Sequence, residues 1–188
     1  MKLFVTETYY SCVEKAAEYI AKSGVGIDSP AVVFCEDKLT LSAESAIAKA
    51  MGGGAFGADV TSLGRYVSKR LKDSSALSKE GSAIVVKKVL SENADKLKTL
   101  SRLGKMPELI EKDEKLRNSR AIVVGFSSVT RQSAEAIKKL VEVCRQVDFF
   151  AVDGENLSLY SNEFSSFVSR TFGLEKIRLN GGESLEQK

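Results

Sequence analysis

Two short stretches of this chain are uninterrupted runs of apolar residues, and they constrain the fold more than any other feature. Residues 31–35 read AVVFC and residues 121–126 read AIVVGF. A strand with one face in water alternates apolar and polar side chains, whereas a strand covered on both faces is apolar throughout. The two runs therefore predict buried strands of a parallel sheet that lies between two layers of helices.

Three further segments have the short, apolar character of strands, at residues 2–5, 59–61 and 147–152. Between the strands, apolar residues recur at the three- and four-residue spacing of helices that bury one face. Thr130 stands where a helix N-cap is expected, before the helical pattern that precedes the last strand. Strands that alternate with helices predict an α/β fold with a doubly wound, mostly parallel sheet and right-handed connections.

The segment between the third and fourth predicted strands departs from this alternation. Residues 76–117 carry apolar residues at helical spacing, many charged residues and no clear strand pattern. We therefore expect a helical insertion over residues 76–117, mounted on an α/β core formed by residues 1–75 and 118–180. Residues 181–188 are mostly polar and are expected to form a flexible tail.

The chain contains no histidine among its 188 residues, which excludes several kinds of chemistry at once. Serine–histidine–aspartate catalysis, cysteine–histidine catalysis and histidine-ligated metals all require the missing imidazole. The three cysteines, Cys12, Cys35 and Cys144, form no CxxC pair, so we expect free thiols in a reducing cytoplasm, with no metal and no cofactor. No apolar run approaches the roughly 20 residues that a membrane span needs, and we expect no contact with a membrane.

The three glycines at residues 52–54 do not have the sequence context of a phosphate-binding loop. Such a loop follows a strand and precedes a helix, whereas this run follows a helical pattern and precedes a strand. We interpret it as the end of a helix. The segment after the first strand, residues 6–12, lacks the glycine and lysine of a phosphate loop, and residues 123–128 around the end of the fourth strand hold no carboxylate. We therefore expect no ATP hydrolysis.

Basic residues lie on one face of the helical pattern that follows the third strand. Arg65, Lys69 and Lys72 are spaced by four and three residues, so they share a face of that helix. Such a row is suited to a phosphate backbone. Composition alone favours an ordinary solvated helix face, because the net charge of the chain is only +3 at pH 7.

Residues 32–71 resemble the N-terminal part of the AddB/RexB-type subunit of bacterial ATP-dependent helicase–nucleases. The resemblance lies in a strand, a Thr-x-x-Ala-Glu motif, a helix, a Gly-Gly pair, a second strand and a Ser-x-x-Arg motif. Residues 121–141 resemble a second segment of that family. The matching positions are Thr40, Ala43, Glu44, Gly52, Gly53, Ser62 and Arg65 in the first segment, and Gly125, Phe126, Thr130 and Gln132 in the second.

This family belongs to the UvrD-like helicase superfamily, so the resemblance implies a P-loop-NTPase-like fold. It further implies a non-catalytic, DNA-facing scaffold in the repair of DNA double-strand breaks, beside a catalytic helicase–nuclease partner subunit. The resemblance assigns contacts with single-stranded or duplex DNA to Thr40, Ser62, Arg65 and Lys69. With only two cations in this set, binding is expected to be weak. Because the family's nuclease domain is missing, we expect a fragment or a divergent stand-alone relative.

A second hypothesis from the residues is a Rossmann-like small-molecule-binding protein or enzyme that uses the loops at the carboxyl ends of the strands. Residues 36–37 and the pair Asp153 and Glu155 would then contact the ligand. Carboxylates in such places are more often turn residues, and we interpret residues 36–38 as a solvated loop. A protein-interaction domain is a third hypothesis.

Overall fold

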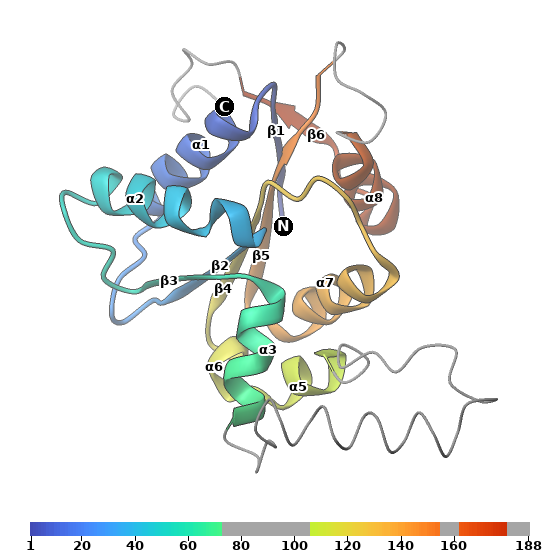
Figure 1. The fold of residues 1–188 in the computed structure, drawn as a ribbon. Helices are drawn as coiled ribbons and strands as arrows, with labels where there is room; N and C mark the ends of the chain where they lie inside the picture. The colour runs from blue at the N-terminus through green and yellow to red at the C-terminus, as the bar shows by residue number, and fades with distance from the viewer. Residues whose placement is uncertain (73–105, 155–161, 180–188) are drawn as a thin grey trace.

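Six parallel strands form the centre of the fold in the computed structural model, which describes residues 1–72, 106–154 and 162–179 (Figure 1). The strand order is β3-β2-β4-β5-β1-β6, and every neighbouring pair is parallel. The α/β fold with a doubly wound sheet is thus confirmed, and the sheet is parallel throughout. The strands are β1 (Leu3–Thr6), β2 (Ala31–Cys35), β3 (Ala58–Thr61), β4 (Arg120–Val124), β5 (Gln146–Val152) and β6 (Lys176–Arg178).

Helices cover both faces of this sheet. The chain moves toward the β3 edge through α1 and α2 and returns toward the β6 edge through the later helices. Right-handed connections that run in opposite directions place their helices on opposite faces, and Figure 1 shows α1 and α2 across the sheet from α7 and α8. The helices are α1 (Tyr9–Lys22), η1 (Asp37–Leu39, a 3-10 helix), α2 (Thr40–Ala50), α3 (Leu63–Lys72), α5 (Met106–Lys112), α6 (Glu114–Arg117), α7 (Arg131–Val143) and α8 (Glu163–Phe172).

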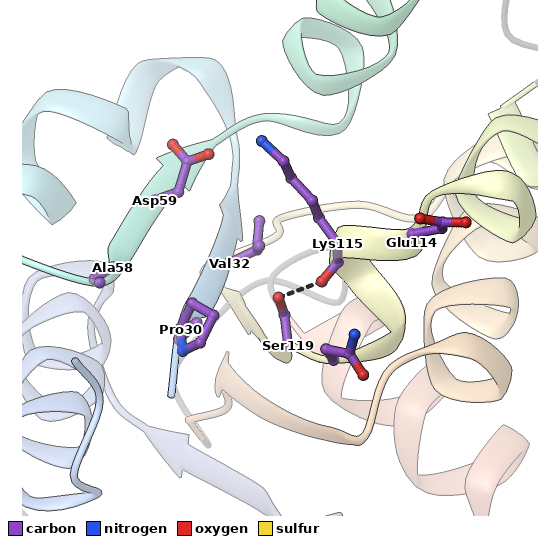
Figure 2. Close-up of a pocket in the computed structure, with 10 residues that line it drawn as sticks. Pro30, Val32, Ala58, Asp59, Glu114, Lys115 and Ser119 are labelled. Atoms are coloured by element: carbon purple, nitrogen blue, oxygen red, sulfur yellow. Dashed lines mark hydrogen bonds between the residues drawn. The ribbon is translucent and has the colours of Figure 1, made fainter. Parts of the chain in front are cut away.

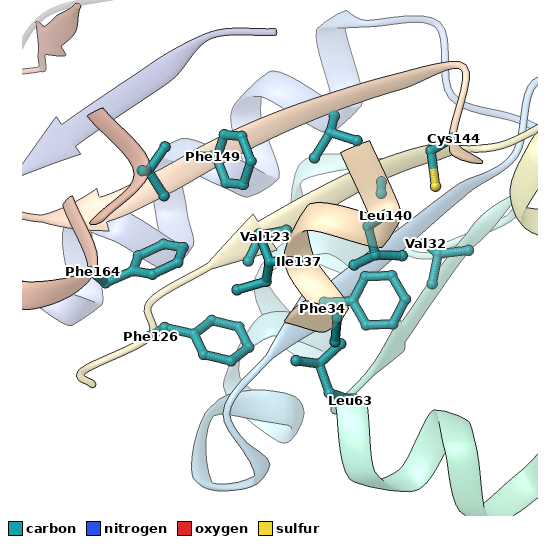
Figure 3. Packing of buried hydrophobic residues seen from close by; sticks show 14 of the residues in the cluster. Val32, Phe34, Leu63, Val123, Phe126, Ile137, Leu140, Cys144, Phe149 and Phe164 are labelled. Carbon is teal, nitrogen blue, oxygen red and sulfur yellow. The ribbon is translucent and has the colours of Figure 1, made fainter. Parts of the chain in front are cut away.

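The sheet divides the hydrophobic core into two clusters, one under each helical layer. On the α7 and α8 side, the fully buried rings of Phe34, Phe149 and Phe164 lie beside Ile137 and Leu140 (Figure 3). On the α1 and α2 side, small residues of α1 pack against the opposite side chains of the same strands. The apolar runs of β2 and β4 serve both clusters, which explains why they do not alternate with polar residues.

The strand predictions were wrong in two places. The fourth strand ends at Val124 rather than at residue 126, because Gly125 adopts a φ of +67° and leaves the extended conformation. The strand β6 was not predicted, since its sequence Lys-Ile-Arg is short and charged. It pairs with β1 at the edge of the sheet, where charged residues have access to water and help to prevent edge-to-edge association.

The predicted helix ends at Thr130 and at the glycine run are confirmed. The side chain of Thr130 accepts a hydrogen bond from Ser133 N at 3.2 Å and caps α7. At the end of α2, Gly53 N donates to Ala48 O at 2.8 Å, and Gly52 and Gly53 both have positive φ. This bond back to the fifth residue before it is typical of a helix C-cap. The glycine run therefore ends a helix and opens no phosphate loop.

Much of the expected helical insertion lies outside the described residues. Residues 73–105 and 180–188 are not described, so the helical character of the former and the flexible tail stay predictions. The last part of the insertion forms α5 and α6, whose Ile110 and Leu116 are buried in the cluster under α7. The hydroxyl of Tyr66 on α3 also donates to Asp113, between α5 and α6. These two short helices therefore pack as part of the core.

Candidate nucleic-acid interface

The expected interface lies at the edge of the sheet where all six strands have their carboxyl ends. In open α/β sheets, the loops at this edge are the usual place of ligand contacts. Thr40 begins α2 after the η1 helix that follows β2, and Ser62 directly follows β3. Because β2 and β3 are paired neighbours, these two residues are brought together although 22 positions separate them in sequence.

Ser62 fixes the start of α3 and so the place of Arg65. Its hydroxyl oxygen accepts a hydrogen bond from Arg65 N at 3.2 Å, which satisfies one of the free amides of the first helical turn. The side chain of Arg65 therefore extends from the first turn of α3, at the sheet edge and next to Thr40. The guanidinium Nη1 lies 3.5 Å from Thr40 Oγ1, a contact at the limit of hydrogen bonding.

The centre of this group is Asp37, which was not among the residues predicted to form the interface. Asp37 Oδ1 accepts a hydrogen bond from Ser62 Oγ at 2.8 Å and forms an ion pair with Arg65 Nε at 3.0 Å. The backbone oxygen of Asp37 accepts a third bond, from Thr40 Oγ1 at 2.9 Å. We name these four residues, Thr40, Ser62, Arg65 and Asp37, the Asp37 cluster. Ser62 and Arg65 of this cluster thus bind a carboxylate of the protein itself.

The members of the Asp37 cluster differ in their access to water. Thr40 and Ser62 are buried, whereas the side chains of Arg65 and Asp37 are 63% and 67% exposed. Lys69 is exposed one turn further along α3 and makes no hydrogen bond or ion pair with the part of the chain that the structure describes. Three of the four residues expected at the interface thus meet in one cluster, and the fourth adds a separate positive charge.

Glu36 binds neighbouring polar groups at the same edge of the sheet, between β2 and β4. Its Oε1 accepts hydrogen bonds from Ser127 N at 2.6 Å and from Ser127 Oγ, and its Oε2 lies 2.8 Å from Lys38 Nζ. Burial alone would raise the pKa of Glu36, but the bonds from Lys38 and Ser127 outweigh it and lower this pKa. The expectation of a solvated loop at residues 36–38 was therefore wrong for Glu36, whose side chain is only 20% exposed.

The position of a phosphate loop, after β1, is occupied by the protein's own polar groups. Thr8 is the N-cap of α1, and its Oγ1 accepts a hydrogen bond from Ser11 N at 3.1 Å. Tyr9 follows, with Lys38 Nζ 5.5 Å from the centre of its ring. A phosphate group at this helix end would have to compete with the threonine hydroxyl for the amide and displace a bulky ring.

Asp153, which follows β5, serves the packing of the last helix and strand. Its carboxylate accepts hydrogen bonds from Ser165 Oγ on α8 at 3.2 Å and from Lys176 Nζ on β6. Asp153 is buried, so these contacts tie α8 and β6 to β5. Glu155, the other carboxylate that the small-molecule hypothesis named, lies outside the described residues.

The opposite edge of the sheet contains a cleft of about 570 Å³. It lies at the amino ends of the strands, between Pro30, Ala58 and Asp59 on one side and Lys115 and Ser119 on the other (Figure 2). The small-molecule hypothesis expected a ligand at the carboxyl ends, where the Asp37 cluster is. The cleft therefore does not coincide with the loops that this hypothesis named.

The three cysteines are buried free thiols. Burial raises the pKa of each thiol to about 12, which makes all three poor nucleophiles at neutral pH. In residues 1–72, 106–154 and 162–179, no three carboxylate or thiol side chains lie close enough to hold a metal ion. Within the same ranges, no helix is both long and apolar enough to span a bilayer.

Comparisons with known proteins leave the function open. No family model and no curated protein matches this chain. Among solved structures, the chain is similar to the protein TT1426 from Thermus thermophilus, with 15% sequence identity and a TM-score of 0.37 over 96% of this chain and 85% of that one. Similarity at this level supports no conclusion about function, so the assignment of the fold rests on the strand order and register.

Proposed function

We propose that this chain is a non-catalytic, helicase-like module of a DNA double-strand-break repair helicase–nuclease subunit. In this role it contacts DNA as a scaffold and hydrolyses no ATP. The proposal is supported by the resemblance of residues 32–71 and 121–141 to the AddB/RexB-type subunit, together with a doubly wound parallel sheet of the kind that this resemblance implies.

The observation that carries the proposal is the meeting of hydroxyl and guanidinium groups at the carboxyl edge of β2 and β3. The hydroxyl of Thr40 lies 3.5 Å from the guanidinium Nη1 of Arg65, and the hydroxyl of Ser62 accepts a hydrogen bond from the Arg65 amide. Lys69 follows one turn later on α3. Hydroxyl and guanidinium donors are those that proteins commonly place on DNA phosphates. Contacts with the phosphate backbone carry no base information, so this binding would be independent of sequence.

The proposal of a module without ATP hydrolysis is supported at two strand ends. The helix end after β1 is capped by Thr8, and no lysine or glycine stands in residues 6–12. The chain after β4 continues through Gly125 to Ser127, whose amide and hydroxyl bind the Glu36 carboxylate. Neither end presents the groups that hold nucleotide phosphates and magnesium in P-loop enzymes.

As a scaffold, the module would act beside a catalytic helicase–nuclease partner subunit in the cytoplasm. The three free, buried thiols are in keeping with a reducing compartment. Binding of DNA by this chain alone would be weak, with a dissociation constant of roughly 10⁻⁴–10⁻⁶ M, because non-specific binding of that strength comes from contacts with phosphates. The proposal includes both single-stranded and duplex DNA as ligands.

The proposal is tested by titrating fluorescently labelled single-stranded DNA with the protein at several salt concentrations. The variant Arg65→Ala, Lys69→Ala removes both cations of the interface. The control variant Lys49→Ala, Arg145→Ala removes two exposed cations near the amino ends of the strands, so the change in net charge is the same.

We expect the wild type and the control to bind with similar affinity and similar dependence on salt. The interface variant should bind more weakly, and the slope of log K against log[salt] should be less negative by roughly 1.4, since each phosphate contact to a single strand contributes about 0.7. Equal affinity and equal slope for both double variants would exclude this surface as the DNA interface. Absence of binding by the wild type at low salt would contradict the proposed function.

A further inference from the structure

The carboxylate of Asp37 binds two of the donors that the proposed function assigns to a phosphate. Its Oδ1 binds Ser62 Oγ at 2.8 Å and Arg65 Nε at 3.0 Å. A serine hydroxyl and the Nε atom of arginine each carry a single hydrogen. While both hydrogens point to Asp37, neither is available to a phosphate oxygen, and the negative charge of Asp37 offsets the positive charge of Arg65.

We infer that Asp37 is a built-in competitor for the DNA phosphate, and that Ser62 Oγ and Arg65 Nε can bind a phosphate oxygen only after its carboxylate has left them. This inference rests on the proposed function, because it concerns the same surface and takes a phosphodiester oxygen as the ligand. Asp37 weakens the binding of DNA, whereas Thr40, Ser62, Arg65 and Lys69 support it. Asp37 thus regulates how strongly the interface holds a nucleic-acid strand.

The exposure of the ion pair makes this exchange feasible. The side chains of Arg65 and Asp37 are 63% and 67% exposed, and water weakens ion pairs of this kind. The backbone of Asp37 is held separately, since its carbonyl accepts the hydrogen bond from Thr40 Oγ1 at 2.9 Å. The carboxylate can therefore rotate away about its side-chain bonds while η1 and the start of α2 stay in place.

Substitution of Asp37 by asparagine tests the inference with little change of shape. Asparagine keeps an oxygen that can accept a hydrogen bond from Ser62, but it does not attract Arg65 as an ion. We expect Asp37→Asn to bind single-stranded DNA about fivefold more tightly at low salt, the size of effect that one removed charge at close range has in water. The salt slope should stay close to that of the wild type, because Arg65 neutralises a phosphate in the complexes of both proteins.

The control variant is Asp28→Asn, which removes an exposed carboxylate before β2, at the amino edge of the sheet. Both variants raise the net charge by one unit, so a general electrostatic effect changes both affinities equally. A larger gain in affinity for Asp37→Asn than for Asp28→Asn therefore shows a local effect of Asp37 at this surface. Circular dichroism and thermal unfolding of each variant show whether the fold is unchanged before affinities are compared.

A double-variant cycle separates competition for Arg65 from simple repulsion of DNA by Asp37. If Asp37 acts by occupying Arg65, the gain from Asp37→Asn should largely disappear in an Arg65→Ala background. If Asp37 merely repels the strand, the gain should remain in that background. Persistence of the full gain without Arg65 would therefore overturn the inference.

The outcomes also distinguish the inference from the proposed function. If Arg65→Ala weakens binding but Asp37→Asn and Asp28→Asn bind alike, the inference is wrong and the proposed interface stands. If Arg65→Ala and Lys69→Ala have no effect and no variant binds more tightly, the proposed interface is wrong and the inference falls with it. A selective gain for Asp37→Asn that depends on Arg65 supports both.

Discussion

The carboxylate of Glu36, at the end of β2, is bound by the amide and the hydroxyl of Ser127, beyond the end of β4. This contact joins two neighbouring strands whose following helices lie on opposite faces of the sheet. Doubly wound proteins commonly bind ligands at such a place. Here the protein's own negative charge occupies it, next to the Asp37 cluster, where a second carboxylate does the same.

Loss of the Glu36 charge should weaken the fold at neutral pH. We expect Glu36→Gln to lower the free energy of unfolding by about 1–2 kcal/mol at pH 7, since hydrogen bonds to charged groups are stronger than neutral ones. Urea denaturation measures this change. The control Glu7→Gln, at an exposed residue after β1, should change stability by less than about 0.5 kcal/mol.

The effect of Glu36 should depend on pH in a defined direction. The pKa of Glu36 in the folded protein is lowered from its ordinary value of 4.5, so folding favours the charged form. The stability from this carboxylate is present above about pH 4.5 and is lost as the pH falls through the lowered folded-state pKa. The free energies of unfolding of wild type and Glu36→Gln, measured by urea denaturation, should therefore differ less at acid pH than at pH 7. A difference in stability that grows on acidification would refute this account.

Two glycines with similar backbone angles should respond differently to alanine. Gly57 has a φ of +85°, and a Cβ there would lie 2.3 Å from the backbone of Gly26, whereas Gly24 has a φ of +69° and open space around it. We expect Gly24→Ala to lower the free energy of unfolding by about 1–2 kcal/mol from backbone strain alone. Gly57→Ala should cost a further ~1–3 kcal/mol, because the loop must move. Equal losses in thermal or urea unfolding would show that the close approach of the two loops does not exist.

The cluster under α7 should be sensitive to lost volume. Leu140 is fully buried there, beside Ile137. We expect Leu140→Ala to lower the free energy of unfolding by about 2–5 kcal/mol and Ile137→Val by about 0.5–1.5 kcal/mol. If Leu140→Ala does not fold, the loss of unfolding free energy in Ile137→Val still tests the packing of this cluster. A loss below about 0.5 kcal/mol for Leu140→Ala would contradict its burial.

Magnesium-ATP should not bind tightly to this protein. The amide at the start of α1 is satisfied by Thr8, and Tyr9 and Glu7 stand where a phosphate loop would have glycines and a lysine. Isothermal titration calorimetry with Mg-ATP should detect no binding in the micromolar range. A micromolar dissociation constant would contradict the proposal of a module without ATP hydrolysis.

Most of the fold could be predicted because the strongest signals were local. The apolar runs of β2 and β4 indicated strands buried on both faces, and Thr130 indicated a helix start. The strand β6 could not be found this way, because its stability comes from pairing with β1 rather than from its own residues. The order of the strands is likewise a property of the assembled sheet, which the sequence pattern constrains only through general rules of connection.

The candidate site was predictable in part. Thr40, Ser62 and Arg65 were named from a resemblance, and the structure places them together. The role of Asp37 was missed, since a carboxylate in a turn has no distinguishing pattern in sequence. Its partners lie 25 and 28 positions away, so only the pairing of β2 with β3 brings it to them. Glu36 was missed for the same reason, with its partner 91 positions away.

The measurement that tests the central claim most directly is a map of the surface that single-stranded DNA contacts. Amide shifts in nuclear magnetic resonance spectra of the labelled protein, followed during titration with an oligonucleotide at low salt, give this map residue by residue. We expect the largest changes in η1, at the start of α2 and in the first turns of α3, around Asp37, Thr40 and Arg65. Changes confined to the cleft near Pro30 and Ser119 at the opposite edge of the sheet, or no changes at all, would contradict the account.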